Sequence, residues 1–211
     1  MFGIINYEVF LLTGILLNLI PGADTIYIVG RSISQGRKAG VYSVFGIISG
    51  SLIHTLLVAF GLSIILTKSI ILFNFIKIVG VIYLVYLGIR MLLDKSNFYF
   101  SASGSNKQQS LRKTYIQGML TSLTNPKVSL FFVSFLPQFI DTKASGPIPF
   151  IILGLTFSFT GLIWCLVVAY FSSFITKKLN MNQRIGTYLN KVTGMIFIGL
   201  GLTLLRTKAP Q

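Results

Sequence analysis

Six long apolar stretches constrain this chain more than any other feature of its sequence. A transmembrane helix needs about 20 consecutive apolar residues, and most of the stretches exceed that length. Runs such as residues 62–66 do not show the alternation typical of membrane β-barrels. The sequence therefore predicts an all-α, polytopic integral membrane protein with six transmembrane helices, at residues 5–30, 40–66, 70–93, 115–139, 149–175 and 188–205.

Composition supports this interpretation. Only 10% of the 211 residues are charged, whereas about a quarter are charged in a typical soluble domain. Six spans would use about 120 residues, so we expect residues 1–211 to form one membrane domain without a separate soluble part. The 18 Lys and Arg residues, against 4 Asp and Glu, lie between the apolar stretches. That pattern indicates loops facing anionic lipid and predicts no nucleic-acid partner.

The distribution of basic residues predicts the orientation in the membrane. Short cytoplasmic loops carry an excess of Lys and Arg, and here the first, third and fifth connections are the basic ones. The second connection offers mainly Lys68, and the fourth offers Lys143 beside Asp141, so we expect both termini outside, although Arg206 and Lys208 mildly oppose that placement. The basic residues of the three predicted cytoplasmic connections are Arg31, Arg37, Lys38, Arg90, Lys95, Lys107, Arg112, Lys113, Lys177, Lys178 and Arg184.

The chain also shows a weak internal repeat. Residues 77–83 and 191–197 share a lysine, a glycine and an isoleucine at matching positions, followed by an aromatic residue, and each half has a proline in its first span. We predict two three-helix halves at about 1–94 and 114–211, joined by a cytoplasmic loop at 95–113. Because three is odd, the halves would insert with opposite topology, and inverted repeats with interrupted helices are typical of transporters.

The two prolines predict helix breaks at membrane depth. Pro21 removes the hydrogen bond to the Leu17 carbonyl, with Gly22 loosening the next turn, and Pro126 does the same to the Ser122 carbonyl. Free carbonyls suit an ammonium group, whereas the amides that start a new half-helix favour a carboxylate. The pattern is typical of a site for the zwitterionic head of an amino acid. The alternative is a pair of plain proline kinks.

Ionisable residues near the breaks are candidate site residues. Lys127 and Asp24 lie inside apolar stretches, where charge is costly and usually functional. Lys127 is expected to meet a substrate carboxylate, while Asp24 binds an ammonium or a proton, or the two pair directly. His54 shares a helix face with Gly46 and Gly50, so its imidazole should point into the bundle, either as a proton relay or as a hydrogen-bonded packing residue.

Other features have a structural and a functional interpretation side by side. Gln35, Gly36 and Arg37 form a basic turn that is either a topology anchor or a gate. Glycine-rich faces permit a homodimer but suit internal packing equally well. The sequence has no nucleotide-binding or hydrolase motif and no His, Cys and acidic cluster. We therefore expect no enzyme activity, no cofactor and no metal site.

Two blocks of residues form a recognisable pattern: the first is residues 18–25 followed by 31–40, and the second contains 117–118, 124–127, 131–132 and 135–139. Both blocks resemble the LysE/RhtB family of bacterial amino-acid exporters. The resemblance implies a six-span inner-membrane carrier that expels amino acids or close derivatives, driven by the proton-motive force. Many relatives have Pro-Asn where this chain has Ala23-Asp24, which leaves the charge of the substrate open. The motif residues carried over are Pro21, Gly22, Asp24, Gln35, Gly36, Asn125, Pro126 and Lys127.

Two rival functions remain at this point. One is export of an inorganic cation, which one buried acid and no soft ligands make a poor fit. The other is a membrane structural or signalling component without transport, in which Asp24 and Lys127 would form a static ion pair.

Overall fold

A computed structural model describes residues 3–62, 70–93, 109–141 and 146–181, together with single helical positions between 188 and 202. Within these ranges all regular secondary structure is helical, so the all-α prediction is confirmed. One isolated antiparallel bridge joins Ile4 to Ile140. The elements are α1 (Tyr7–Leu19), α2 (Ala23–Gln35), α3 (Arg37–Leu57), η1 (Val58–Leu62), α5 (Ile70–Leu93), α6 (Leu111–Leu123), α7 (Pro126–Leu130), η2 (Phe131–Phe135), η3 (Leu136–Phe139) and α8 (Ile148–Met181).

Within the described ranges, two helical segments are long and apolar enough to cross a membrane. They are Arg37–Gly61 and Ile148–Ser172, and α1 with α2 qualifies as a third span if this pair, bent by 46°, counts as one. Large apolar side chains on their outer faces are exposed, including Leu12, Phe60 and Phe159. Such exposed apolar surface is what a lipid-facing helix presents.

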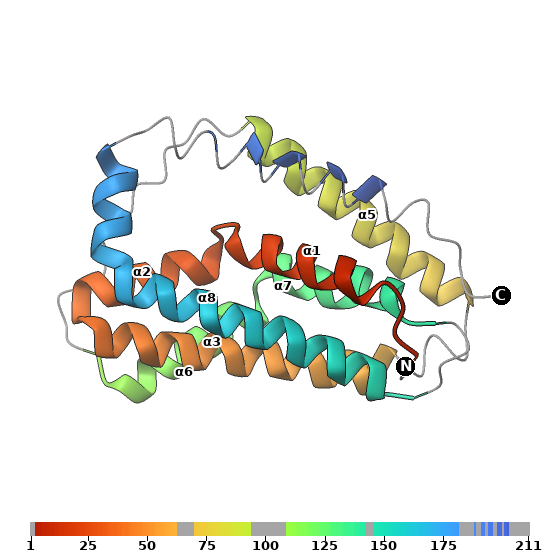
Figure 1. Cartoon of the computed structure of the whole chain (residues 1–211), viewed down its shortest axis with the longest axis horizontal. Helices are drawn as coiled ribbons and strands as arrows, with labels where there is room; N and C mark the ends of the chain where they lie inside the picture. Colours follow the sequence, from red (N-terminus) through yellow and green to blue (C-terminus); the bar gives the residue numbers. More distant parts are fainter. Residues whose placement is uncertain are drawn as a thin grey trace.

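The helices form a bundle with one helix on its outside. Figure 1 shows α3 running along the long axis beside α6 and α8, while the broken pair α1 and α2 crosses the same bundle. Glycines set the spacing of α3 and α6. A side chain at Gly50 would lie 2.8 Å from the Met119 carbonyl, and one at Gly46 would meet the Tyr115 carbonyl. Both glycines of the predicted small-residue face therefore pack internally.

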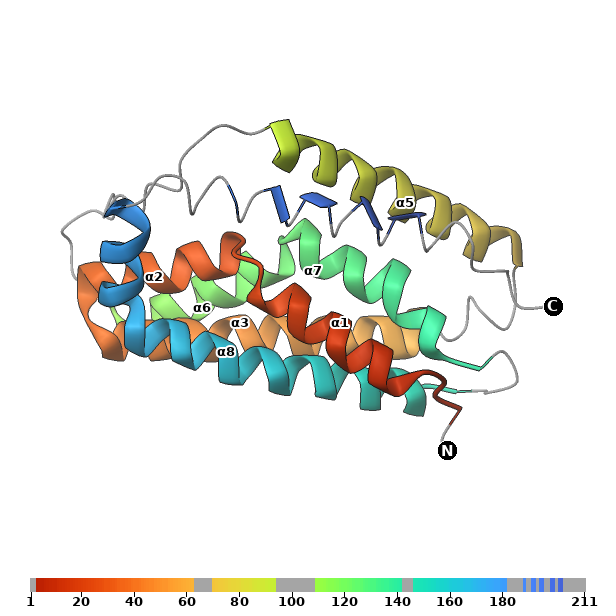
Figure 2. The ribbon, with the colours of Figure 1, turned by 45° about the horizontal axis from the view of Figure 1, so that its top comes forward.

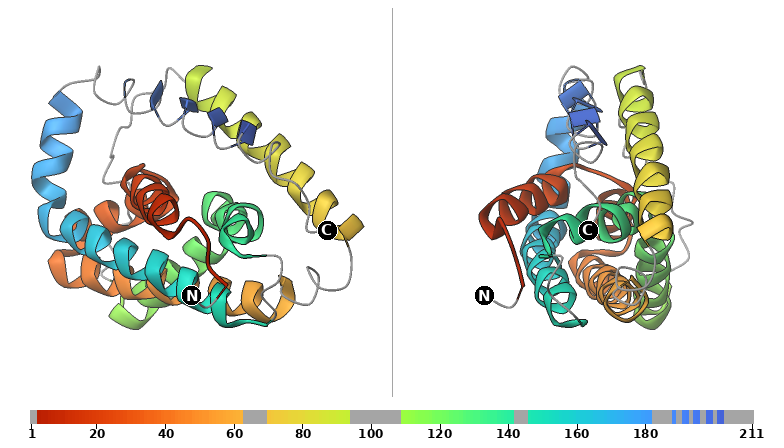
Figure 3. Two further views of the ribbon diagram at one scale, coloured as in Figure 1. Left: turned by 45° about the vertical axis from the view of Figure 1, so that its right-hand side comes forward. Right: turned by 90° about the vertical axis from the view of Figure 1, so that its right-hand side faces the viewer.

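The outer helix α5 runs beside the described positions between 188 and 202, as the views in Figures 2 and 3 agree. A side chain added to Gly88 would lie 2.7 Å from the Gly194 carbonyl, so the two segments approach closely. The side chains of Lys77 and Tyr83 and residues 193, 196 and 197 lie outside the described part. The predicted repeat motif is therefore not tested here, and the loop at 95–108, Lys68, Lys143, Arg184, Arg206 and Lys208 also fall outside it.

The helices extend further than the apolar stretches, which corrects the placement of the basic residues. The first connection is the single residue Gly36, whose φ of 84° suits glycine, and Arg31 lies on α2 while Arg37 begins α3. Arg90, Arg112, Lys113, Lys177 and Lys178 are likewise on helices. The prediction that these residues lie in connections was wrong. Arg90 already lay within the stretch at 70–93, and for the others helical hydrogen bonding continues beyond the apolar stretch. The turn between α2 and α3 and the start of α6 still lie at the same end of the bundle (Figure 1).

Candidate functional site

The first helix break lies at the predicted proline. Helix α1 ends at Leu19 and α2 begins at Ala23, with Pro21 between them. Gly22 is the N-cap residue of α2 and has no side chain, so no side chain from this position caps the first amides of the half-helix. The carbonyls at the end of α1 are used differently. Those of Leu17 and Ile20 both accept hydrogen bonds from the Lys127 ammonium, each at 2.8 Å.

The second break is satisfied by its own neighbourhood. Helix α6 ends at Leu123, and α7 begins at Pro126. The Asn125 side-chain oxygen accepts from the Lys127 backbone N–H at 3.0 Å and so caps α7. The Ser122 carbonyl, which Pro126 frees from its helical bond, accepts from the Asn125 backbone N–H at 3.1 Å. Within the described residues, a lysine ammonium from elsewhere in the chain takes the carbonyls of the first break, and no such ammonium reaches the second.

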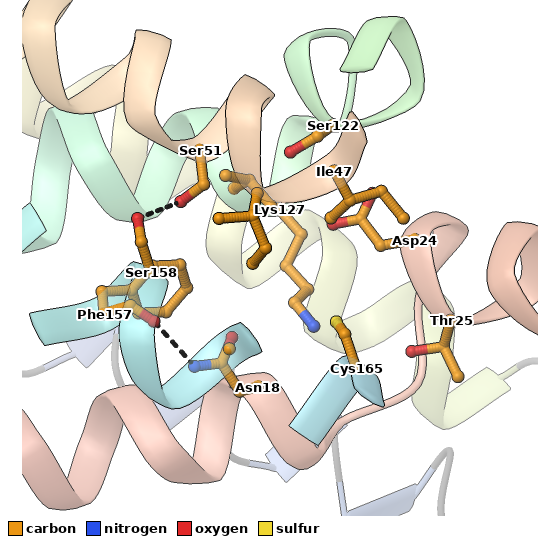
Figure 4. Close-up of a pocket in the computed structure, with 13 residues that line it drawn as sticks. Asn18, Asp24, Thr25, Ile47, Ser51, Ser122, Lys127, Phe157, Ser158 and Cys165 are labelled. Atoms are coloured by element: carbon orange, nitrogen blue, oxygen red, sulfur yellow. Dashed lines mark hydrogen bonds between the residues drawn. The ribbon is translucent and has the colours of Figure 1, made fainter. Parts of the chain in front are cut away.

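Lys127 therefore joins the two breaks. Its backbone begins α7 at the second break, while its side chain reaches the end of α1 at the first. Figure 4 shows the Lys127 ammonium pointing toward Asn18 and Cys165, away from the Asp24 carboxyl. The sequence predicted that this ammonium faces a substrate carboxylate and that the freed carbonyls face a substrate ammonium. In this conformation the Lys127 ammonium itself donates hydrogen bonds to those carbonyls.

Asp24 lies on the first turn of α2, within hydrogen-bonding reach of the Asn125 side chain. Its Oδ1 atom is buried and has no hydrogen-bond partner within the described residues. The positive charge of Lys127 acts on it electrostatically. The fold therefore gathers Asp24, Asn125 and Lys127 around one point. The static ion pair expected by the non-transport alternative is replaced by two separate arrangements, lysine on carbonyls and aspartate beside an amide.

His54 lies on α3 against the second break. Its Nε2 is 3.3 Å from the Ser122 carbonyl, the same carbonyl that Pro126 frees, and its ring stacks on Phe132. Since a carbonyl only accepts, this contact requires the tautomer with hydrogen on Nε2. The arrangement suits the hydrogen-bonded packing role. The other residues singled out from the sequence, Gln35, Gly36 and Arg37, form the tight turn between α2 and α3 and lie at the end of the bundle.

A small cavity lies between the two breaks. Its volume is about 30 Å³, which is room for about two water molecules, so an amino acid does not fit in this conformation. Polar and apolar side chains share the lining, and Figure 4 shows Ser51 and Ser158, 2.8 Å apart, on one side of it. The lining residues are Asn18, Asp24, Thr25, Ile47, Ile48, Ser51, Ser122, Lys127, Val128, Phe157, Ser158, Gly161 and Cys165.

Several lining residues were not singled out from the sequence. Asn18 donates to the Phe157 carbonyl and to Thr160, and its only signal was its place three residues before Pro21. Ser51 and Ser158 had no signal beyond being small polar residues in apolar helices. Cys165 was interpreted as a packing residue, yet it lines the cavity beside Lys127 (Figure 4).

Contacts on both sides of the cavity hold the helices together. On the side of the N-terminus, a cluster of aromatic rings packs around Phe131, whose ring stacks on Phe157 at 4.2 Å between centroids. At the opposite end, Arg31 of α2 donates to the Gln117 side chain of α6 at 2.7 Å and lies over the Tyr27 ring, 5.4 Å from its centroid. Tyr27 in turn donates to a carbonyl of α6. We call this second set the α2–α6 contact; it comprises Tyr27, Arg31, Thr114 and Gln117.

Comparison with known proteins gives one consistent set of relatives. Residues 15–208 match the family described as LysE type translocator. An uncharacterized membrane protein of Bacillus subtilis, YrhP, is 32% identical over 191 residues, which cover 87% of this chain and 90% of the relative. Leucine efflux proteins of Klebsiella pneumoniae and Salmonella typhimurium are 30% and 28% identical, each over 96% of both chains. No solved structure matches the chain.

Proposed function

This chain belongs to the LysE type translocator family, and from that membership we propose that it is a secondary carrier exporting amino acids across the bacterial cytoplasmic membrane. Members of the family are membrane transporters and not enzymes. The apolar helices of this chain suit a location in the membrane. The carrier function predicts a site inside the bundle at which a small zwitterion loses its hydration and is held by fixed polar groups.

The observation that carries the proposal is the meeting of the two helix breaks. At the first break, carbonyls at the end of α1 face uncapped amides at the start of α2, so acceptors and donors lie side by side. An amino acid presents the complementary pair, an ammonium and a carboxylate. We propose that Pro21, Gly22, Asp24, Asn125, Pro126 and Lys127 form this site, with the substrate ammonium at the carbonyls and Asp24, and its carboxylate near the α2 amides.

The lining of the cavity favours an amino acid with an apolar side chain. Ile47, Ile48, Val128 and Phe157 lie on the cavity wall together with the polar groups of the breaks. An aliphatic side chain buried against such a wall gains roughly 25 cal/mol per Å² of apolar surface. Two of the relatives are leucine efflux proteins, and we propose leucine and similar aliphatic amino acids as the substrates of this chain.

We further propose six spans arranged as two inverted halves, at about 1–94 and 114–211, with both termini outside. What supports this is the pair of broken helices, α1 with α2 and α6 with α7, each the first helix of its half. The cavity holds no amino acid in its present size, so transport requires the halves to open alternately to each side. We propose that protons drive the cycle, with Asp24 as the titrating group and His54 in the hydrogen-bonded packing role. We also propose a homodimer, which a mass measurement in detergent tests.

The experiment that tests export uses cells loaded with dipeptides, which are hydrolysed inside to raise the internal amino acid pools. All amino acids released into the medium are measured with the parent chain, with Lys127→Ala, and with Lys113→Ala as a matched control, since Lys113 is exposed at the start of α6. We expect selective release with the parent and the control and none with Lys127→Ala. Unchanged release from cells shown to contain the inserted parent chain would contradict amino-acid export and return attention to cations.

A further inference from the structure

The position of the Lys127 ammonium carries an inference that rests on the proposed function. Its two acceptors, the Leu17 and Ile20 carbonyls, belong to the interrupted end of α1, where helical partners are missing. These are the carbonyls to which the ammonium of a bound amino acid would donate. A primary ammonium on a four-carbon stem has the same donor chemistry as that group. The lysine therefore occupies the part of the site that the substrate needs.

The side chain is anchored in a way that allows it to leave. The backbone of Lys127 is fixed by the Asn125 cap at the start of α7. The Lys127 side chain passes close to Gly22. A Cβ added at Gly22 would lie 3.7 Å from both Cδ and Nζ of the lysine. Within the described residues, the atoms that a side chain at Gly22 would meet belong to Lys127 alone, so the glycine leaves room beside the stem. The flexible end of Lys127 can turn while its backbone stays in place.

Replacing the Lys127 ammonium by the substrate ammonium at these carbonyls leaves the net charge of the site unchanged. Asp24 and Lys127 together contribute no net formal charge, and the Asp24 Oδ1 atom is buried without a hydrogen-bond partner within the described part of the chain. A zwitterionic amino acid adds none either. When its ammonium takes the carbonyls and approaches Asp24, its carboxylate arrives beside a lysine that has just lost two acceptors. Each group that is released meets a new partner.

We propose that Lys127 is a tethered substitute for the substrate ammonium. In the empty carrier its ammonium donates hydrogen bonds to the carbonyls of Leu17 and Ile20. When substrate binds, the lysine breaks these bonds and turns to the substrate carboxylate. An empty carrier with bare carbonyls would leave buried acceptors unpaired, which is costly. The lysine removes that cost and so lets the empty carrier return for the next substrate. Net export needs this return, whereas exchange of one substrate molecule for another does not.

The test compares net efflux with exchange in proteoliposomes containing the purified chain and no proton gradient. Labelled leucine inside is released either into empty buffer or into buffer with unlabelled leucine. For Lys127→Met we expect the ratio of net efflux to exchange at saturating leucine to fall about tenfold or more, because the empty carrier has lost the group that pairs its carbonyls. The exposed Lys113→Met is the control. Equal loss of both rates, or retention of both, would overturn the proposal.

Two further measurements keep the test independent of one variant. Ethylammonium, which donates N–H bonds, should restore net efflux by Lys127→Ala, whereas tetramethylammonium, which has no N–H, should not; equal effects of the two would contradict the proposal. The parent chain needs no substitution. Its net efflux should be close to its exchange rate, and exchange more than about tenfold faster would also overturn the inference. A parent chain that shows neither rate for any amino acid would instead refute the proposed function.

Discussion

Replacing Asn125 by aspartate perturbs the site at the point where its charges are most closely balanced. The side chain is 4% exposed, caps α7 through the Lys127 N–H and lies within hydrogen-bonding reach of Asp24. Aspartate caps a helix about as well as asparagine, so Asn125→Asp keeps the cap and adds one negative charge beside Asp24. The variant therefore isolates the electrostatic contribution.

The magnitude follows from Coulomb's law. Two carboxylates about 4 Å apart repel by about 4 kcal/mol at an effective dielectric constant of 20. The positive charge of Lys127 reduces this figure, and uptake of a proton by one carboxyl limits it further. We expect a loss of about 2 kcal/mol in stability and at least a tenfold loss of leucine efflux. By comparison, Asn125→Ala removes the cap, which costs about 1 kcal/mol, and the amide beside Asp24 without adding a charge.

The matched control is the exchange of the two residues. In the double variant Asp24→Asn with Asn125→Asp, one carboxylate and one amide still face each other, so efflux should return to within about threefold of the parent. Stability is measured by thermal unfolding in detergent and transport by efflux from proteoliposomes. The reasoning is refuted if Asn125→Asp transports as well as the parent, or if the double variant is no better than Asn125→Asp alone.

Three other perturbations test neighbouring parts of the account. Pro21→Ala gives position 21 an N–H that competes with the lysine for the Leu17 carbonyl, so we expect unfolding temperature to hold while efflux is lost; full efflux would contradict the role of the break. His54→Gln retains a donor for its partner carbonyl without a titrating ring, so efflux and its pH profile should be unchanged, and a shifted profile would favour a proton relay. Arg31→Ala removes the bond to Gln117, worth about 1.5–3 kcal/mol, and should speed alkylation of the single cysteine; an unchanged rate would show that the α2–α6 contact does not limit opening.

The breaks and their charged neighbours could be predicted because they follow from local chemistry. Proline removes a defined hydrogen bond four residues back, which located the free carbonyl of Leu17. Lysine and aspartate deep in apolar stretches are costly wherever they lie, which singled out Lys127 and Asp24. No tertiary information was needed for either inference.

The partners of those groups could not be predicted, because they come from other helices. That Lys127 reaches Leu17, 110 residues away, depends on how α7 is placed against α1. Ser51 and Ser158 meet only because α3 and α8 pack together, and a serine in an apolar helix carries no sign of that. Helix ends were also misplaced, since the basic residues at the ends of α2 and α6 continue the helical hydrogen bonding beyond the apolar segment.

The central claim, that an exported amino acid binds between the two breaks, is tested most directly with the native cysteine. Cys165 is the single cysteine of the chain and lines the cavity beside Lys127. The measurement is the rate at which a small neutral thiol reagent modifies Cys165 in proteoliposomes, with and without leucine. The account predicts that leucine slows modification and that an amino acid the carrier does not export has no effect. An identical rate at saturating concentrations of an amino acid proven to be exported would contradict the placement of the site.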